Sequence, residues 1–569
     1  MVQTQSALWT PRAGFDAGAT RSLAAALDAP LAIADALVRR GVRDPEAASA
    51  FLSPSLDALH DPLALRDMDR ALARVNRALA ANERILVQGD YDVDGITSTF
   101  LLVSVLRSLG GQAAPRIPHR TRDGYGLTVA AVDAAQRAGV QLIVTVDCGI
   151  TANEPIDHAR SLGIDVVVTD HHEPGPTLPN AEAVVNPIRP GCEYPFKSLA
   201  GVGVTFKLVQ ALFEARGRAE AAFEALDLVA LGTIADVVPL IGENRILARH
   251  GLASLAATTR PGLRELMRVA GVDGRRLTDV HVAFMLAPRI NAAGRMGHAD
   301  QALELLFARD EVEGRRLAEV LERENQKRRK FDESAAREAS ERVVSQLGWP
   351  GPASLVLWDE HWHPGVVGIV ASRLVERFQR PALLVALDGD LGRGSARTTG
   401  GIDLTEILAG CDDLLATWGG HAAAAGFTLR RDQLVPFRTR VESLVAARLD
   451  PEACVPRVDH DAELTLAECS LELIEWIDRM APFGLANPEP HFLIRGVTID
   501  QLGRVGDGRH LKLQIRDGAA ALEAIGFGLG ETAAGIARGA RVDLVAVPTR
   551  NEWNGTTRLQ LRVRALRPA

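Results

Sequence analysis

The sequence has few cysteines, few aromatic residues and no long apolar run. Its 569 residues include five scattered cysteines without a CxxC pair, which argues against a zinc ribbon or a disulfide framework and is typical of a reducing compartment. No run approaches the roughly 20 apolar residues of a membrane span, and the N-terminus lacks the basic start and apolar core of a signal peptide. We therefore expect a cytoplasmic protein with no membrane partner.

The charge balance gives no sign of a strongly basic protein. The net charge is −8, charged residues make up 24% of the chain, and apolar residues make up 47%. This composition is typical of a globular protein of about four domains. A polyanionic partner would therefore require a local basic groove.

Five regions differ in their residue patterns. Residues 1–75 have helical spacing, and residues 76–300 alternate β-branched runs with helical patterns, which predicts a parallel sheet covered by helices. Residues 301–347 predict one long connecting helix, and 350–450 a second, smaller α/β domain. Residues 455–569 contain five strand-like runs and the Asn-Gly hairpin signal of "NEWNGTT". We predict an α/β protein with a C-terminal OB-like β-barrel that binds single strands.

Four apolar runs, far apart in the sequence, carry acidic or imidazole residues at or near their ends. These residues are Asp90, Asp92 and Asp94 in "VQGDYDVDG", Asp147 in "VTVDCG", Asp170, His171 and His172 in "VVVTDHH", and Asp236 in "LGTIADVVPL". Each motif alone is more typical of a loop, a cap or a satisfied polar residue. Four such motifs together favour a shared site.

A divalent-metal site accounts for this crowding. The carboxyl ends of neighbouring parallel strands meet in one crevice, where close carboxylates repel one another and raise each other's pKa. Carboxylates suit hard divalent ions, and Mn²⁺ also accepts imidazole. Two ions roughly 3.5–4 Å apart would neutralise the cluster and form a hydrolytic centre.

The same four motifs resemble those of the DHH phosphoesterase superfamily. The motifs are "DYDVDG", "VDCG", "DHH" and "GTIADVVPL". Further stretches, including "APRINAAGRMGHA", "HWHPGVVGIVASRL" and "GGHAAAAGF", extend the resemblance over nearly the whole chain to the 5′→3′ single-strand DNA exonucleases of this superfamily. Short phosphodiesterases of the superfamily lack the long helix and the β-rich tail.

The resemblance implies specific roles for these residues. The metal ligands would be Asp92, Asp94, Asp147, His171 and Asp236, with Asp147 as the bridging carboxylate. Many relatives have a histidine upstream of the first DxD, where this chain has Gln88-Gly89-Asp90, so Asp90 is either a direct ligand or a catalytic residue that supports the ligands. His172 would contact the scissile phosphate or the leaving group.

Candidate phosphate contacts lie outside this cluster. They are Arg120, Arg289, Asn291, Arg295, Ser395, Arg397, Gly419, Gly420 and His421. Ser395 and Arg397 are expected in a glycine-rich loop, as a clamp for a terminal phosphate. Gly419 and Gly420 are expected to cradle a phosphate before His421 and an Ala-rich helix. Solvated arginines and an ordinary glycine turn are the alternatives.

The resemblance implies a 5′→3′ exonuclease that hydrolyses single-stranded DNA in repair and recombination with two divalent ions, Mn²⁺ or Mg²⁺. Its partners would be single-stranded DNA with a 5′ end, a single-strand-binding protein and a helicase. One alternative is a phosphodiesterase for short oligoribonucleotides or cyclic dinucleotides. Another is a non-catalytic replication scaffold, against which the intact ligand set argues.

Overall fold

The chain folds into two compact units. The computed structural model describes residues 7–119, 123–124, 126–296, 299–347, 351–398, 401–531, 535–553 and 556–569. The larger unit comprises Thr10–Val320 and Asp459–Ala569, and the smaller comprises Met1–Trp9 and Leu321–Val458. Within the described ranges, none of the helices combines the length and the apolar content that a membrane span requires.

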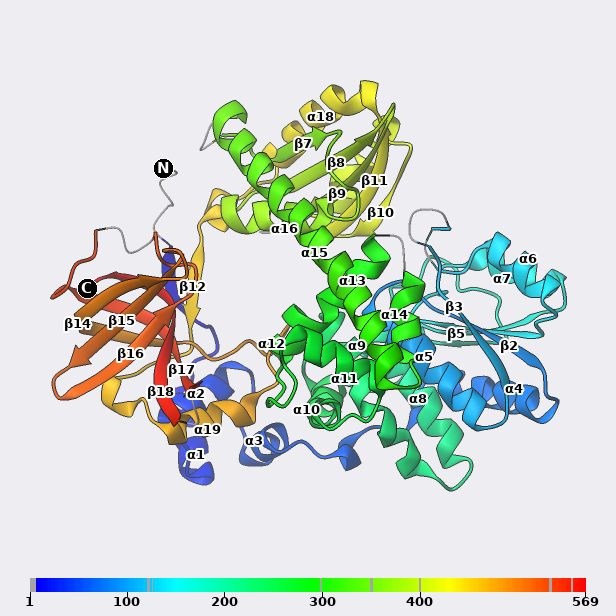
Figure 1. Cartoon of the computed structure of the whole chain (residues 1–569), viewed down its shortest axis with the longest axis horizontal. Helices are drawn as coiled ribbons and strands as arrows, with labels where there is room; N and C mark the ends of the chain where they lie inside the picture. The colour runs from blue at the N-terminus through cyan, green and yellow to red at the C-terminus, as the bar shows by residue number, and fades with distance from the viewer. Residues whose placement is uncertain are drawn as a thin grey trace. The chain divides into compact units, whose positions relative to one another are not determined.

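The larger unit contains a five-stranded parallel sheet (Figure 1). Its strands are β2 (Arg84–Gln88), β3 (Gln112–Arg116), β4 (Leu142–Val146), β5 (Asp165–Thr169) and β6 (Ala183–Val185), in the order β3-β2-β4-β5-β6. The chain therefore starts in β2, moves to one side for β3, and returns to the other side for β4. A doubly wound sheet binds its ligands at such a reversal, here between the ends of β2 and β4.

Helices cover this sheet, and every residue of the central strand β4 is buried. In chain order, the helices of this part of the larger unit are α4 (Met68–Ala80), α5 (Val93–Ser108), α6 (Val129–Arg137), α7 (Asn153–Ser161), α8 (Gly201–Glu214), α9 (Leu226–Ala235), α10 (Gly242–Ala256), α11 (Pro261–Ala270), α12 (Asp279–His281), α13 (Ala287–Arg295) and α14 (Ala299–Leu306). The long apolar runs of the sequence are thus buried strands and helices of an α/β core.

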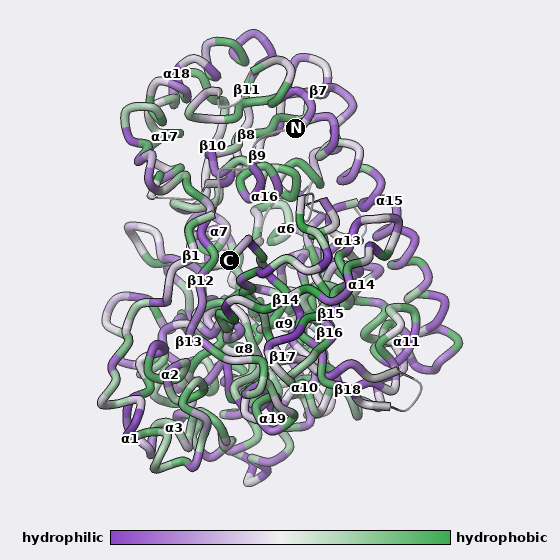
Figure 2. Tube along the Cα trace, turned by 90° about the vertical axis from the view of Figure 1, so that its left-hand side faces the viewer, coloured by the Kyte–Doolittle hydropathy of each residue, from purple (hydrophilic) through white to green (hydrophobic). Residues whose placement is uncertain are grey.

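The prediction of one long helix over 301–347 is wrong at its N-terminal end. α14 ends at Leu306, and α15 (Glu311–Arg342) begins only after Asp310, whose side chain accepts hydrogen bonds from the N–H groups of Val312 and Glu313 at 2.9 Å each. An aspartate that caps a first turn starts a new helix. α15 itself is long and mainly hydrophilic, as Figure 2 shows.

The C-terminal strands form the predicted barrel. They are β14 (Phe492–Val505), β15 (His510–Asp517), β16 (Ala520–Gly526), β17 (Arg541–Trp553) and β18 (Thr556–Pro568). Neighbouring strands follow the order β14-β15-β16-β18-β17, and the pairing of β14 with β17 closes the barrel. This five-stranded closure is that of an OB-fold. The Asn-Gly signal lies outside the described residues, and the strands flanking it pair antiparallel.

The N-terminal helices share a hydrophobic core with this barrel. α1 (Ala17–Leu27), α2 (Leu31–Arg39), α3 (Pro45–Leu52) and α19 (Leu471–Met480) contribute buried apolar side chains to it. The short strand β13 (Ala462–Glu463) pairs with β14, whereas β1 (Leu8–Pro11) and β12 (Arg457–His460) form a separate two-stranded sheet at the residues where the chain passes from one unit to the other. The two ends of the sequence therefore build one structural element.

The smaller unit is a second α/β sheet with the order β10-β11-β9-β8-β7. Its strands are β7 (Leu355–Asp359), β8 (Ala382–Asp388), β9 (Leu391–Arg397), β10 (Thr417–His421) and β11 (Ala424–Arg430). α15 and α16 (Val367–Phe378) contribute to one core, and α17 (Leu404–Ala409) and α18 (Leu434–Ala446) to another. The predicted fold class, an α/β protein with a C-terminal barrel, is confirmed.

Candidate active site

The end of β2 leads directly into an acidic turn that starts α5. Asp92 is the N-cap of α5, and its Oδ1 accepts a hydrogen bond from the N–H of Gly95 at 3.1 Å. Asp94 lies in the first turn, where its two oxygens accept hydrogen bonds from the N–H groups of Gly201 and Val202, each at 2.7 Å. Asp94 thereby holds the N-terminus of α8, where the helix dipole favours a carboxylate.

Two glycines allow helices to approach these carboxylates closely. A Cβ on Gly201 would lie 2.4 Å from Oδ1 of Asp147, and a Cβ on Gly232 would lie 3.0 Å from Oδ1 of Asp94. The first distance is far below van der Waals contact. The close packing of α8 against Asp147 and of α9 against Asp94 therefore depends on the absence of side chains at these positions.

Imidazole and carboxylates converge where β4, β5 and α9 end. Nε2 of His171 lies 3.1 Å from Oδ1 of Asp147, 3.6 Å from Oδ2 of Asp236 and 4.0 Å from Oδ2 of Asp94. Asp147 and His171 follow adjacent parallel strands, as expected. Asp236 reaches the cluster from the C-terminus of a helix instead of a strand end.

Asp170 positions the second histidine. Its Oδ1 lies 2.8 Å from Nδ1 of His172 and also accepts the N–H of His171 at 2.7 Å, while Oδ2 accepts the N–H of Ile150 at 2.9 Å. Burial disfavours the charged forms, but the contact between Asp170 and His172 outweighs it, lowering the pKa of Asp170 and raising that of His172. Each partner therefore favours the charged form of the other.

Three buried carboxylates of the cluster, Asp94, Asp147 and Asp236, have raised pKa values. Burial is the main cause for each, followed by the charges of the neighbouring aspartates. The pKa of Asp94 rises to about 7, that of Asp236 to about 9, and that of Asp147 well above its usual range. Burial and the nearby His172 lower the pKa of His171 to about 4, so His171 is a neutral ligand at pH 7.

These residues fit divalent metal ions. Ligand atoms within 4.8 Å of one another form three sets: Asp94, His171 and Asp236; Asp147, His171 and His172; and Asp90, Asp92 and Asp147. The buried Nε2 of His171 and Oδ2 of Asp236 make no hydrogen bond with any described residue. Oxygen ligands with one imidazole suit Mn²⁺. Asp147 and His171 belong to more than one set, which favours neighbouring ions.

The predicted phosphate contacts on α13 have contacts inside the protein. Oδ1 of Asn291 accepts the N–H of Val93 at 3.1 Å, which ties α13 to the first turn of α5. Arg289 is buried and donates to the carbonyl of Met285 in the same helical run. Arg295 lies partly buried at the end of α13. Arg120 lies outside the described residues.

Two local predictions for the smaller unit are wrong. Ser395 and Arg397 lie on strand β9 rather than in a loop, and Nη1 of Arg397 donates to Oγ of Ser395 at 3.0 Å. Of the four alanines after His421, Ala422 and Ala423 form a turn and Ala424 and Ala425 begin strand β11, so the predicted helix is absent. Gly419 and Gly420 belong to β10, whose register with β11 places Gly419 opposite Gly426 and His421 opposite Ala424. Pairing within the sheet overrides the helix propensity of alanine here.

The same pairing gathers the predicted phosphate contacts of this unit on one sheet. β11 pairs Gly426 with both Ser395 and Gly419, and Ala424 with both Arg397 and His421. Positions two residues apart on a strand share a face. Ser395, Arg397, Gly419 and His421 therefore share one face, whereas Gly420 belongs to the other.

Sequence reasoning missed two features of the cluster. Asp170 received no role, although it stands in the same triplet as both histidines. The amides of Gly201 and Val202 carry no side-chain signal, and only the glycine-rich start of "GVGVTF" marked a close approach.

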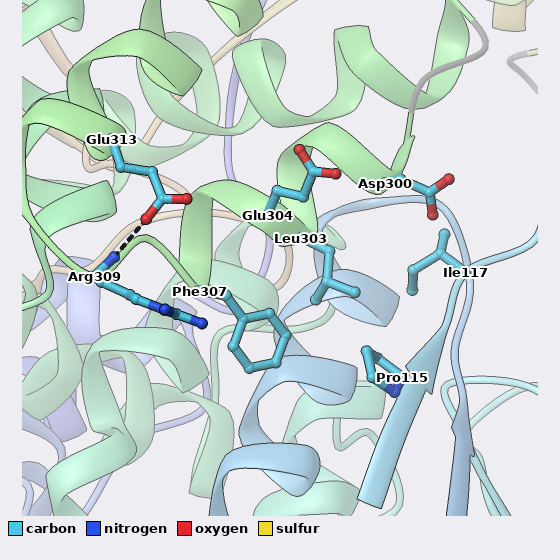
Figure 3. Close-up of a pocket in the computed structure, with 8 residues that line it drawn as sticks. All are labelled: Pro115, Ile117, Asp300, Leu303, Glu304, Phe307, Arg309 and Glu313. Carbon is cyan, nitrogen blue, oxygen red and sulfur yellow. Dashed lines mark hydrogen bonds between the residues drawn. The ribbon is translucent and has the colours of Figure 1, made fainter.

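A separate pocket lies between β3 and α14 (Figure 3). It has a volume of about 500 Å³, an apolar floor that includes Leu303 and Phe307, and the carboxylates of Asp300, Glu304 and Glu313. None of the residues that line it belongs to the metal-ligand sets. Its acidic rim would repel a polyanion, so we do not place the substrate there.

We predict that Asp147→Asn weakens Mn²⁺ binding by at least about 100-fold, because even residues that merely support a ligand change metal affinity 10- to 100-fold. The amide also removes one of the mutually repelling charges, so the metal-free variant should melt at a higher temperature than the metal-free wild type. Calorimetric titration and thermal melts measure both effects. A variant that binds Mn²⁺ normally would contradict the site.

A second prediction concerns pH. The pKa of an aspartate is about 4 in the unfolded chain, but about 7 for Asp94 and about 9 for Asp236 in the folded protein. The folded state therefore binds more protons than the unfolded state between these values, and the metal-free protein should lose stability as pH rises from about 4 to about 9. Mn²⁺ displaces these protons, so its affinity should rise over the same range, with proton release at pH 7. Titrations in buffers of different ionisation enthalpy count the protons; zero release would contradict the electrostatics.

Comparisons with known proteins agree with this arrangement. The DHH family N-terminal domain matches residues 84–233, the DHHA1 domain matches 351–447, and the RecJ OB domain matches 460–565. The single-stranded-DNA-specific exonuclease RecJ of Bacillus subtilis is 40% identical over 552 residues, covering 96% of this chain and 69% of that protein. RecJ of Escherichia coli is 40% identical over 523 residues, covering 87% and 89%.

The fold also matches solved structures. The crystal structure of RecJ in complex with Mn²⁺ from Thermus thermophilus superposes with a TM-score of 0.85 at 34% identity, covering 99% of this chain and 80% of that one. The Mg²⁺ complex of the same protein matches with a TM-score of 0.80 at 32% identity, covering 99% and 78%. With its DHH, DHHA1 and OB domains, the chain belongs to the RecJ family.

Proposed function

We propose that this protein is a metal-dependent exonuclease that hydrolyses the phosphodiester bonds of single-stranded DNA from the 5′ end. The observation that carries the proposal is the cluster of carboxylates and imidazole at the point where the parallel sheet reverses its order. The relatives named single-stranded-DNA-specific exonuclease support the substrate. A single-strand-binding protein and a helicase are the partners that such a substrate favours.

The proposed ligands are Asp92, Asp94, Asp147, His171 and Asp236. Two divalent ions bound there would supply the Lewis acidity that activates water and neutralises charge on the phosphoryl group. Nδ1 of His172 lies 2.8 Å from Oδ1 of Asp170, so in the protonated form of His172 the second ring proton is on Nε2. From there His172 can donate a hydrogen bond to the phosphate or a proton to the leaving oxygen.

The smaller unit offers a second anion site. Arg397 donates to Ser395 and also to the carbonyl of Ala396 at 2.7 Å, and a Cβ on Gly368 of α16 would lie 2.9 Å from Oγ of Ser395. A guanidinium and a hydroxyl are thus held together by close packing. A planar cation beside a hydroxyl suits a terminal phosphate, which has more charge and more free oxygens than an internal one.

The proposal predicts strand and end selectivity. With Mn²⁺, a 5′-labelled single strand should lose its label in the first products, a 3′-labelled strand should shorten progressively, and a blunt duplex should resist. Asp147→Asn should abolish digestion of both labelled strands while still binding them. Release of the 3′ label first would contradict the proposed 5′→3′ polarity. Digestion of a blunt duplex at the same rate as a single strand would contradict the proposed selectivity for single strands.

We also predict that Arg397→Ala reduces the preference for 5′-phosphorylated over 5′-hydroxyl strands by roughly ten- to a hundred-fold, the range for loss of a charge-assisted hydrogen bond. The loss should appear in KM, with metal content unchanged. Arg430→Ala is the matched control, because Arg430 is an exposed arginine of the same sheet, paired with Asp432 at 3.1 Å. Equal effects in both variants would rule out the clamp.

A further inference from the structure

Five large apolar side chains are exposed on three segments of the larger unit, one of which begins directly after Asp236. They are Val237, Ile241, Val280, Phe284 and Leu485, here called the apolar rim, with exposed fractions between 40% and 69%. Large apolar groups gathered on a surface mark a binding site more often than scattered ones do. All five lie in the larger unit.

The loop before β14 joins the three segments of the rim. The N–H of Leu240 donates to the carbonyl of Leu485 at 2.8 Å, and a Cβ on Gly484 would lie 2.8 Å from Leu240. On its other side, the backbone N–H of Phe483 donates to the carboxylate of Asp279, the residue before Val280. One short loop therefore contacts the segments that carry Val237 and Phe284.

The rim also borders one of the proposed metal ligands, Asp236. Val237 directly follows Asp236 and has a φ of 62°, a left-handed conformation that is costly for a β-branched residue. Phe284 lies on a π-helical turn, Val282–Leu286, that packs against α9, and the C-terminus of α9 carries Asp236. Irregular helical turns of this kind are common at functional sites.

Its chemistry suits one part of the substrate. Every nucleotide has a phosphate, which the metal-ligand cluster would take, and a base with an apolar face. In a single strand these faces are available for stacking on aromatic side chains, whereas in a duplex they are covered by neighbouring bases. The five rim side chains have no hydrogen-bonding group, so they accept any base.

We propose that the apolar rim binds the nucleobases next to the scissile bond, with Phe284 as the stacking side chain. The inference rests on the proposed function and adds a source of strand selectivity to it. A duplex cannot offer its base faces to the rim, and an abasic strand has none to offer. The rim therefore recognises an unpaired strand without reading its sequence.

The test compares a 5′-phosphorylated oligodeoxynucleotide with the same strand carrying tetrahydrofuran abasic sites at its first four nucleotides, both with Mn²⁺. For wild type we expect the abasic strand to raise KM roughly ten-fold, the scale of one lost base-aromatic stack. Phe284→Ala should raise KM on the normal strand to a similar extent and reduce the difference between the strands. Phe284→Trp should keep the KM difference between the two strands, because tryptophan also offers an aromatic face for stacking.

The matched control is Phe15→Ala, because Phe15 is also an exposed phenylalanine, 59% accessible, but lies outside the rim. Mn²⁺ titration should be unchanged in all variants, which excludes damage to the ligand cluster. Leu485→Ala gives an independent probe of the rim and should reduce the same discrimination.

The outcomes separate the two proposals. Cleavage of the normal strand with no difference for the abasic strand would overturn the rim and leave the nuclease function intact. Phe284→Ala could instead change the oligomeric state in solution and leave the KM difference between the normal and the abasic strand unchanged. That result would identify the rim as a contact between copies of the chain and overturn its binding of bases. No cleavage of any single strand would overturn both.

Discussion

The mutual repulsion of buried carboxylates is the constraint around which the larger unit is organised. Asp94, Asp147 and Asp236 are brought together out of water, and burial with like charge raises the pKa of each. The backbone supplies part of the compensation. Amides of α8 bind Asp94, and the amide of Gly95 binds Asp92. Cations at the cluster would supply the rest, which couples the stability of this region to metal binding.

Because main-chain groups hold Asp92 and Asp94, the geometry of this part of the cluster follows from the packing of helices against the sheet. That packing depends on glycine. Gly201 brings α8 against Asp147, Gly232 brings α9 against Asp94, and a Cβ on Gly95 would lie 2.6 Å from the backbone of Asp90. Each glycine removes a side chain where a carboxylate or its turn must fit. A change at any of them would move a ligand without altering a ligand residue.

The sequence was most informative where topology alone decides the outcome. Acidic residues after parallel strands converge because strand ends share one edge of a sheet, so Asp94, Asp147 and His171 could be brought together without knowledge of packing. Alternating apolar runs likewise predicted the five barrel strands. The convergence of strand ends and the alternation of apolar residues can both be read from local patterns. The closure of the barrel by pairing of β14 with β17 is a tertiary contact that agrees with the predicted OB-like fold.

The sequence was least informative where tertiary contacts override local preference. Four consecutive alanines favour a helix, yet pairing with β9 and β10 makes β11 of the segment that includes Ala424. The helical spacing of apolar residues continues in the sequence from before Arg309 into α15, but the N-cap at Asp310 starts a new helix there. Asn291 resembles a ligand-binding residue, and only the folded chain shows its oxygen bound to Val93. Partners of this kind are invisible in a single sequence.

An exonuclease that degrades any sequence has to bind what all nucleotides share. The net charge of −8 provides no general attraction for a polyanion, so affinity has to come from local contacts. Phosphates can be held by cations at the ligand cluster and by the guanidinium of Arg397. Base faces require an apolar surface close to the reacting bond, and the rim that begins at Val237 supplies one directly beside Asp236. The left-handed backbone of Val237 accompanies this exposure, because a strained conformation holds its apolar side chain in solvent next to Asp236.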